Sequence, residues 1–247
     1  MEKIGVDMKW SARGLWASAS GPAGQGAPAP SWRWVLAAGV VAVVLEASGW
    51  AMLPVKAWLV ASHEFFHALA GWGTGGSVES IQAESMQGVT FTRGGWYPLI
   101  SCAGYLGCGA LGAVCLRYCA RPAMRWGFQV FCVCLALALL VKGGYSNGYA
   151  LGMSEALCID ALALWAARRA WAPFALALCG CLFLSMGFED VKVLLVYATS
   201  QTDAGLLARH WGMPFLAWPI ALFYAAAMVG FWWWAARGLA RDARSGS

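Results

Sequence analysis

Two histidines and a glutamate lie together in one short apolar stretch of the sequence. His63 and His67 are four residues apart in "SHEFFHALAG" (62–71), and Glu64 follows the first histidine. On a helix, residues four apart project from the same face, so both imidazoles can reach one metal ion. An HExxH pattern on a helix is typical of hydrolytic zinc sites, where the glutamate takes a proton from the zinc-activated water. The residues predict Zn²⁺ ligands at His63 and His67 and a general base at Glu64.

The alternative is that these polar groups only form hydrogen bonds inside a helix bundle. Ionisable residues within a membrane helix are costly and are functional by default. Two of the three histidines in the chain fall in this one motif. The metal site is therefore the favoured interpretation.

A catalytic zinc ion needs a third protein ligand and leaves its fourth position to water. A third histidine six residues after His67 is absent, because position 73 is Gly73. Glu84 is a candidate, but it falls within a predicted β-hairpin. Asp203 opens the helical stretch "DAGLLARH" next to the last apolar segment and is the favoured third ligand. Its alternative role is that of an N-cap for this helix.

The composition indicates a membrane protein. Of the 247 residues, 60% are hydrophobic and 12% charged, whereas a soluble domain has roughly twice that charged fraction. Apolar segments long enough to cross the hydrocarbon core recur at about 34–53, 97–116, 126–142, 148–167, 171–188 and 214–236. We expect an all-α polytopic membrane protein with about six or seven transmembrane helices. The chain is expected to be a multi-pass protein of the cell membrane.

The charge pattern does not point to a nucleic-acid partner. The net charge is +5, but the basic residues cluster at the ends of apolar segments, as in loops retained in the cytoplasm. The nine cysteines lie almost entirely within apolar segments and contain no CxxC pair. We interpret them as small hydrophobic fillers.

The chain divides into a flexible N-terminal arm (1–32), a membrane domain (33–237) and a C-terminal tail (238–247). Pro54 separates the first membrane segment from a second helix that carries HExxH and ends at Gly71 and Gly73. We expect these two helices to form a tight hairpin. In the next helix, Gly104, Cys108 and Gly112 form a stripe of small residues that predicts close helix packing.

The least hydrophobic interior stretch follows the HExxH helix. Its halves "SVESIQ" and "GVTFT" are rich in β-branched residues and are bracketed by glycines, which predicts a short β-hairpin over 76–93. Open strands cannot face lipid, so the hairpin must line a cavity or lie at the interface. An edge strand could bind an extended substrate by β-augmentation, and Val89 and Phe91 are the candidate substrate-binding residues.

These features resemble the site-2 protease clan, and most closely its compact zinc-peptidase-like members. The resemblance covers about 45–235 and rests on HExxH, the Gly-rich hairpin, "GYLG" and the late "TDA…GMP". It implies an intramembrane zinc endopeptidase with ligands His63, His67 and Asp203 and base Glu64. In this chain Ala204 follows the aspartate where the better-studied branch has glycine, and no asparagine lies between 190 and 203. Asn147 is a candidate for supplying an amide to the substrate.

The leading hypothesis is a zinc metalloprotease that hydrolyses a peptide bond in or near a transmembrane segment of a partner protein, within the lipid bilayer. A non-proteolytic zinc-binding scaffold is the alternative. A metal transporter is weaker, because Glu46, Glu155 and Asp160 are scattered along the chain. Orientation stays open: two crossings from a cytoplasmic N-terminus to a cytoplasmic hairpin would leave the arginines at 117–125 outside. Either a span is miscounted or the arm lies outside.

Overall fold

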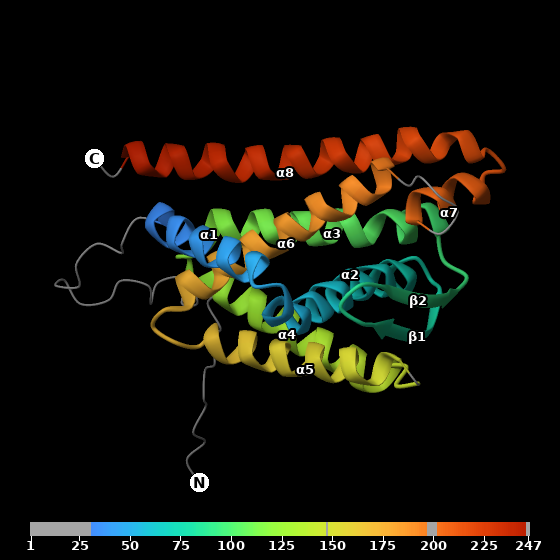
Figure 1. The fold of residues 1–247 in the computed structure, drawn as a ribbon, viewed down its shortest axis with the longest axis horizontal. Helices are drawn as coiled ribbons and strands as arrows, with labels where there is room; N and C mark the ends of the chain where they lie inside the picture. Colours follow the sequence, from blue (N-terminus) through green and yellow to red (C-terminus); the bar gives the residue numbers. More distant parts are fainter. Residues whose placement is uncertain (1–30, 147, 197–201, 246–247) are drawn as a thin grey trace, which may run out of the picture.

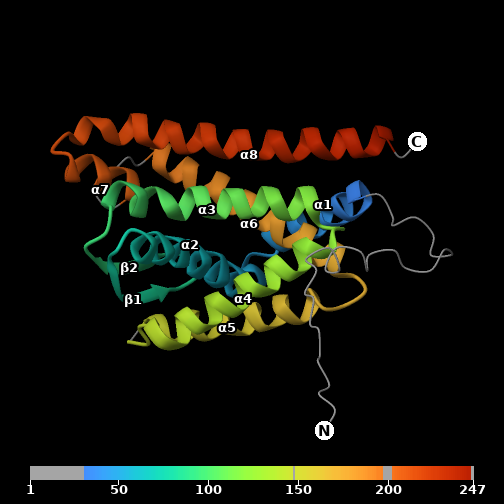
Figure 2. The same ribbon diagram turned by 180° about the vertical axis from the view of Figure 1, so that it is seen from behind.

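The computed structural model describes residues 31–146, 148–196 and 202–245 (Figures 1 and 2). Asn147 and nearly all of the predicted arm fall outside these residues. The helices are α1 (Ser31–Ala47), α2 (Leu53–Gly73), α3 (Tyr97–Tyr118), α4 (Pro122–Lys142), α5 (Tyr149–Ala166), α6 (Ala172–Val196), α7 (Asp203–His210) and α8 (Ala217–Ser245). The strands are β1 (Ser77–Ala83) and β2 (Gly88–Arg93), and short 3-10 turns lie at Gly49–Met52 and Pro214–Leu216.

The described residues contain five helices that are long and apolar enough to cross a membrane, and a sixth candidate in the bent pair α1 and α2. This confirms the predicted class, a mostly helical membrane protein with a small sheet. The last helix continues past the expected boundary at 237, since α8 runs to Ser245. Likewise, α6 extends beyond the apolar segment and includes Glu189.

The expected tight hairpin of the first two helices is wrong. α1 and α2 are bent by 115° at their break, and α1 packs mainly along α6. Gly49 in the break has a φ of 64°, and Pro54 lies in the first turn of α2, where its missing N–H costs no helical hydrogen bond. Ser185 of α6 donates a hydrogen bond to Glu46 near the end of α1 over 2.7 Å. The pair is thus sharply bent, as in a broken span or a re-entrant segment, and is not an antiparallel hairpin.

The hairpin predicted over 76–93 is confirmed. β1 and β2 pair in antiparallel fashion, with a β-bulge between Val78 and Ser80. β1 packs against α2, α4 and α5, whereas β2 lies on the side of α7 (Figures 1 and 2). On its outer edge, β1 forms a further bridge from Ile81 to Gly143, at the end of α4. The hairpin is therefore held inside the helix bundle on one side.

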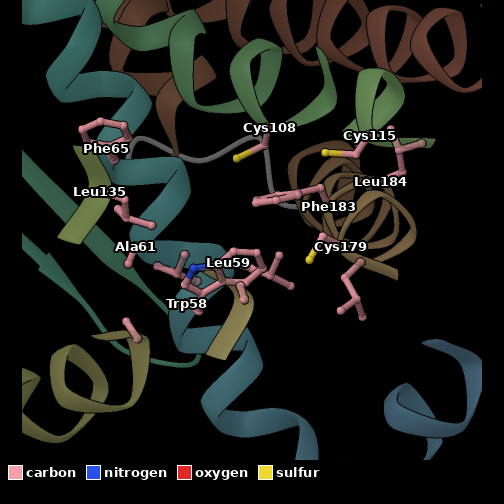
Figure 3. Packing of buried hydrophobic residues seen from close by; sticks show 14 of the residues in the cluster. Trp58, Leu59, Ala61, Phe65, Cys108, Cys115, Leu135, Cys179, Phe183 and Leu184 are labelled. Atoms are coloured by element: carbon pink, nitrogen blue, oxygen red, sulfur yellow. The ribbon is translucent and has the colours of Figure 1, made fainter. Parts of the chain in front are cut away.

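The core lies where α2, α3, α4 and α6 meet (Figure 3). Trp58 of α2 packs against Phe183 of α6, with ring centroids 5.0 Å apart. All nine cysteines are free thiols, and five of them are buried, in line with their interpretation as fillers. The small-residue stripe of α3 also packs as expected, because a Cβ added at Gly112 would lie 3.1 Å from the backbone oxygen of Gly180 in α6. This packing fixes the position of α2 in the bundle.

Candidate active site

The HExxH motif lies on the buried face of α2. His63, Glu64 and His67 are 8%, 6% and 6% exposed, and they follow each other within the fourth and fifth turns of an uninterrupted helix. The ring centroids of the two histidines are 4.8 Å apart. Local helix geometry alone therefore brings the two imidazoles together, as the four-residue spacing predicts.

Asp203 completes a cluster with the two histidines. Its Oδ2 lies 3.3 Å from Nε2 of His63 and 3.4 Å from Nε2 of His67. Among the described residues, these three form the group of side chains whose ligand atoms could hold one metal ion, and the atoms lie within 4.8 Å of one another. Glu84, the competing carboxylate, is not part of it. The structure thus brings together residues that are 140 positions apart in the chain.

Asp203 is available for this cluster because another residue caps its helix. The hydroxyl of Thr202 accepts the N-cap hydrogen bond from the backbone N–H of Gly205, at 3.2 Å. Burial alone raises the pKa of the Asp203 carboxyl, but the adjacent imidazoles of His67 and His63 outweigh it and hold this pKa well below its ordinary value. The carboxyl is therefore ionised and faces the two ring nitrogens.

The start of α3 supports both of the elements that carry the cluster. Nδ1–H of His67 donates a hydrogen bond to the backbone oxygen of Ile100 at 2.5 Å, which leaves Nε2 as the nitrogen that faces the cluster. The hydroxyl of Ser101 donates to the backbone oxygen of Asp203 at 2.9 Å. Two consecutive residues of α3 therefore hold α2 and α7 in register.

The "GYLG" segment of α3 forms the wall beside His63. A Cβ added at Gly104 would overlap the imidazole ring of His63. The ring of Tyr105 meets the same imidazole edge to face, with centroids 4.7 Å apart, and stacks on Tyr224 of α8 at 4.9 Å. The "GYLG" segment therefore packs directly against the cluster at His63.

The hairpin holds Glu64. The hydroxyl of Thr90 lies 2.7 Å from Oε2 of Glu64 and 2.9 Å from its backbone oxygen, so its one hydrogen is shared between these two acceptors. A Cβ added at Gly88 would lie 2.8 Å from Oε1 of Glu64 and 2.7 Å from Val60, so only glycine permits this close approach of β2 to α2. Glu64 in turn lies within electrostatic range of His63, His67 and Asp203.

The two faces of β2 have different neighbours. Gly88, Thr90 and Thr92 face α2, whereas Val89 and Phe91 alternate with them and face the other way, Phe91 being 48% exposed. Val89 and Phe91 therefore lie on the face of β2 opposite to Thr90, which contacts Glu64. Their expected role in substrate binding stays a prediction.

The backbone of β2 has an open edge. The N–H of Glu84 donates to the oxygen of Gln87 at the turn. In an antiparallel ladder every second pair exchanges backbone hydrogen bonds, so counting from this pair the bonded residues of β2 are Val89 and Phe91. Gly88, Thr90 and Thr92 therefore direct N–H and C=O groups away from β1. In the described residues no further strand pairs with this edge.

The remaining carboxylates lie elsewhere. Glu84 ends up in the turn of the hairpin against α5, where a Cβ on Gly152 would lie 2.5 Å from its Cα. Asp160 accepts a hydrogen bond from Nε1 of Trp58 at 3.0 Å, and Glu46 accepts one from Ser185. Glu155 is half-buried on α5. Among the described residues, none of these four carboxylates belongs to the group of side chains that could hold one metal ion.

Sequence reasoning missed Thr90, Gly88, Ile100 and Ser101. Gly88 opens a strand, where glycine is unusual and can mark the close approach of another backbone or ligand, so this signal was present. The backbone oxygen of Ile100 leaves no trace in the sequence.

Searches of the curated proteins and of the solved structures found no match to this chain. The comparison with protein families did: the Peptidase M50B-like family matches residues 34–235, a range that contains the whole cluster, the hairpin and the helices α2–α7. The HExxH helix, the hairpin and the late aspartate thus occur in a chain that belongs to the Peptidase M50B-like family, within the site-2 protease clan.

Proposed function

We propose that this protein is an intramembrane zinc metalloendopeptidase that cuts a peptide bond in or near a transmembrane segment of another membrane protein. One observation carries the proposal: Nε2 of His63 and Nε2 of His67 face the same oxygen of Asp203, and Glu64 is held beside them. His63, His67 and Asp203 are the proposed ligands, and Glu64 is the proposed general base.

Two of the three donor separations match those of a zinc site. Bonds of about 2.0–2.2 Å to nitrogen and oxygen in a tetrahedral site place neighbouring ligand atoms about 3.3–3.5 Å apart. The two N···O separations are 3.3 and 3.4 Å. The hydrogen bond from Nδ1 of His67 to Ile100 is the outer support that zinc-binding imidazoles have. Three protein donors leave the fourth tetrahedral position for water.

When bound, zinc would polarise the scissile carbonyl and lower the pKa of water toward about 7. The proton transfers and the positioning of the base are carried out by residues of the chain. Glu64 accepts the proton of the attacking water at its carboxylate and then gives it to the leaving amine. Thr90 fixes the carboxylate in one orientation, through its hydrogen bond to Oε2. The burial of Glu64, at 6% exposure, limits its exchange of protons with bulk water.

A helical substrate shields its amides and must be extended before it can be cut. The open edge of β2 offers N–H and C=O groups at Gly88, Thr90 and Thr92 for an added strand. Thr90 therefore has two roles, since its backbone would bind the substrate while its side chain orients the base. Val89 and Phe91, on the opposite face, are proposed to contact substrate side chains.

The test separates metal binding from hydrolysis. Glu64→Gln should retain zinc in the purified protein and abolish cleavage, whereas His63→Ala should lose the metal. Substrates would be found by comparing the membrane proteomes of cells that carry the wild type and Glu64→Gln. If Glu64→Gln cells process every membrane protein that wild-type cells process, the chain is a zinc-binding scaffold and the protease proposal fails.

A further inference from the structure

Basic side chains gather at one end of the helix bundle. Within the part of the chain that the structure describes, nine arginines lie at the start of α1, between or beside the ends of α3 and α4, between α5 and α6, and on the last turns of α8 (Figures 1 and 2). They are Arg33, Arg117, Arg121, Arg125, Arg168, Arg169, Arg237, Arg241 and Arg244. Only Asp242 is acidic among the described residues of these segments, and it pairs with Arg117 at 3.0 Å.

Aromatic rings mark the same end as a membrane interface. Guanidinium groups lie over the rings of Trp32, Tyr118, Trp165 and Trp233, at 4.5–5.4 Å from the centroids for Arg33, Arg121, Arg169 and Arg237. Trp and Tyr are enriched where the bilayer meets water, and arginine side chains there reach the headgroups.

The opposite end of the bundle has a different balance of basic and acidic residues. It carries the base of the hairpin, α7 and the cluster of His63, His67 and Asp203 (Figures 1 and 2). Its elements contain the basic residues Arg93, Lys142 and Arg209, together with the acidic residues Glu79, Glu84, Glu189 and Asp203. Arg93 is also neutralised by an ion pair with Glu79 at 2.8 Å. The charge asymmetry thus lies along the direction in which the helices cross the membrane.

The bend between α1 and α2 bears on the membrane orientation. Two crossings before the hairpin would put the start of α1 and the arginines at 117–125 on opposite sides of the membrane, whereas a single crossing puts them on the same side. The start of α1 lies at the same end as the arginine-rich loops and the end of α8 (Figures 1 and 2), which agrees with counting the bent pair of α1 and α2 as one crossing. One orientation now places all nine arginines on one side. Short loops rich in arginine stay in the cytoplasm, where anionic lipids attract them.

We propose that the arginine-rich end faces the cytoplasm and that the hairpin and the His63–His67–Asp203 cluster lie toward the non-cytoplasmic side. Building on the proposed function, the substrates are membrane proteins whose cleavable segment is extended in the non-cytoplasmic half of the bilayer. There the segment pairs with the open edge of β2.

Two loops at the ends of α5 give a matched test. Ser146 precedes α5 on the hairpin side and Ala170 follows it on the arginine side, and both are exposed. In intact cells, a membrane-impermeant maleimide should label Ser146→Cys but label Ala170→Cys only after permeabilisation. The unaltered chain, whose exposed Cys134 and Cys158 lie inside α4 and α5, gives the background.

Labelling of Ala170→Cys in intact cells, alone or with Ser146→Cys, overturns the proposal, and so does failure of Ser146→Cys to react before permeabilisation. The labelling does not depend on proteolysis, so the orientation can stand where the protease proposal fails. Cleavage sites mapped in the proteomes of wild-type and Glu64→Gln cells test the substrate class separately. Sites in the cytoplasmic half of the substrate segments would refute it.

Discussion

The hydroxyl of Thr90 and the carboxylate of Glu64 lie 2.7 Å apart, although one is on the hairpin and the other on the buried face of α2. A carboxylate with several rotatable bonds needs such a partner if it is to act on one water in one direction. Gly88 makes the contact sterically possible, because any side chain there would collide with Glu64. The hairpin therefore connects the edge proposed to bind substrate with the proposed base, Glu64.

Thr90→Val should slow cleavage while zinc content is unchanged. Valine keeps the shape of threonine but lacks the hydroxyl, and a hydrogen bond to a charged group contributes about 1.5–3 kcal/mol. We expect kcat to fall about ten- to a hundredfold, with a smaller change in KM. Thr90→Ser should restore most of the rate.

Thr92→Val is the matched control for Thr90→Val. Thr92 is on the same face of β2, but its methyl group lies near Gly71 and not near Glu64. Equal loss of rate in Thr90→Val and Thr92→Val would mean that the hydroxyl of Thr90 supports only the hairpin.

Asp203→Ala should reduce zinc occupancy about as much as His67→Ala. Removing a direct ligand should exceed the roughly ten- to hundredfold loss of affinity that outer-shell changes cause. Asp203→Asn should keep the fold but bind zinc weakly. Metal analysis of the purified variants measures both effects.

Glu84→Ala and Asp160→Ala are the controls for Asp203. Glu84 lies in the hairpin turn against α5, and Asp160 accepts its hydrogen bond from Trp58. Neither change should lower the zinc content. If Glu84→Ala loses the metal while Asp203→Ala retains it, the third ligand is Glu84 and not Asp203.

The parts of the site that depend on local geometry could be read from the sequence. The four-residue spacing of His63 and His67 places them on one face of any helix. The alternation of residue types around Val89 indicates a strand, and this signal does not depend on what the hairpin packs against. The prediction of Asp203 as the third ligand depends instead on the resemblance and on its place at the start of a helical stretch next to the last apolar segment. Thr202 lies beside it and is also a residue type that caps helices, and only the structure shows which of the two caps α7.

Relationships set by tertiary packing could not be read in this way. Gly49 and Pro54 mark a break between α1 and α2, but the angle of 115° depends on how α1 packs along α6. The contact of Thr90 with Glu64 depends on the depth at which the hairpin inserts between the helices. Neither quantity has a periodic signature in the sequence.

Proline in β2 should impair cleavage more than zinc binding. Val89→Pro or Phe91→Pro removes a backbone donor that pairs with β1, which distorts the strand whose edge is proposed to bind substrate. Ser85→Pro is the control, since it places proline in the turn between the strands without removing a ladder bond. If zinc content falls as far as cleavage does in Val89→Pro, the hairpin has only a structural role.

Gly104→Ala should lower zinc content although Gly104 is not a ligand. The added Cβ would overlap the imidazole of His63, so either the ring turns away from Asp203 or α3 moves away from α2. Overpacking of this kind costs about 1–3 kcal/mol, and at this position the strain falls on a ligand. Gly127→Ala in α4 is the control, because a Cβ there meets nothing within 4 Å. Metal analysis and a thermal melt of both variants separate the effects: Gly104→Ala should lose zinc beyond any loss of folded protein. Full zinc content in a folded Gly104→Ala variant would show that His63 does not need the close approach of α3.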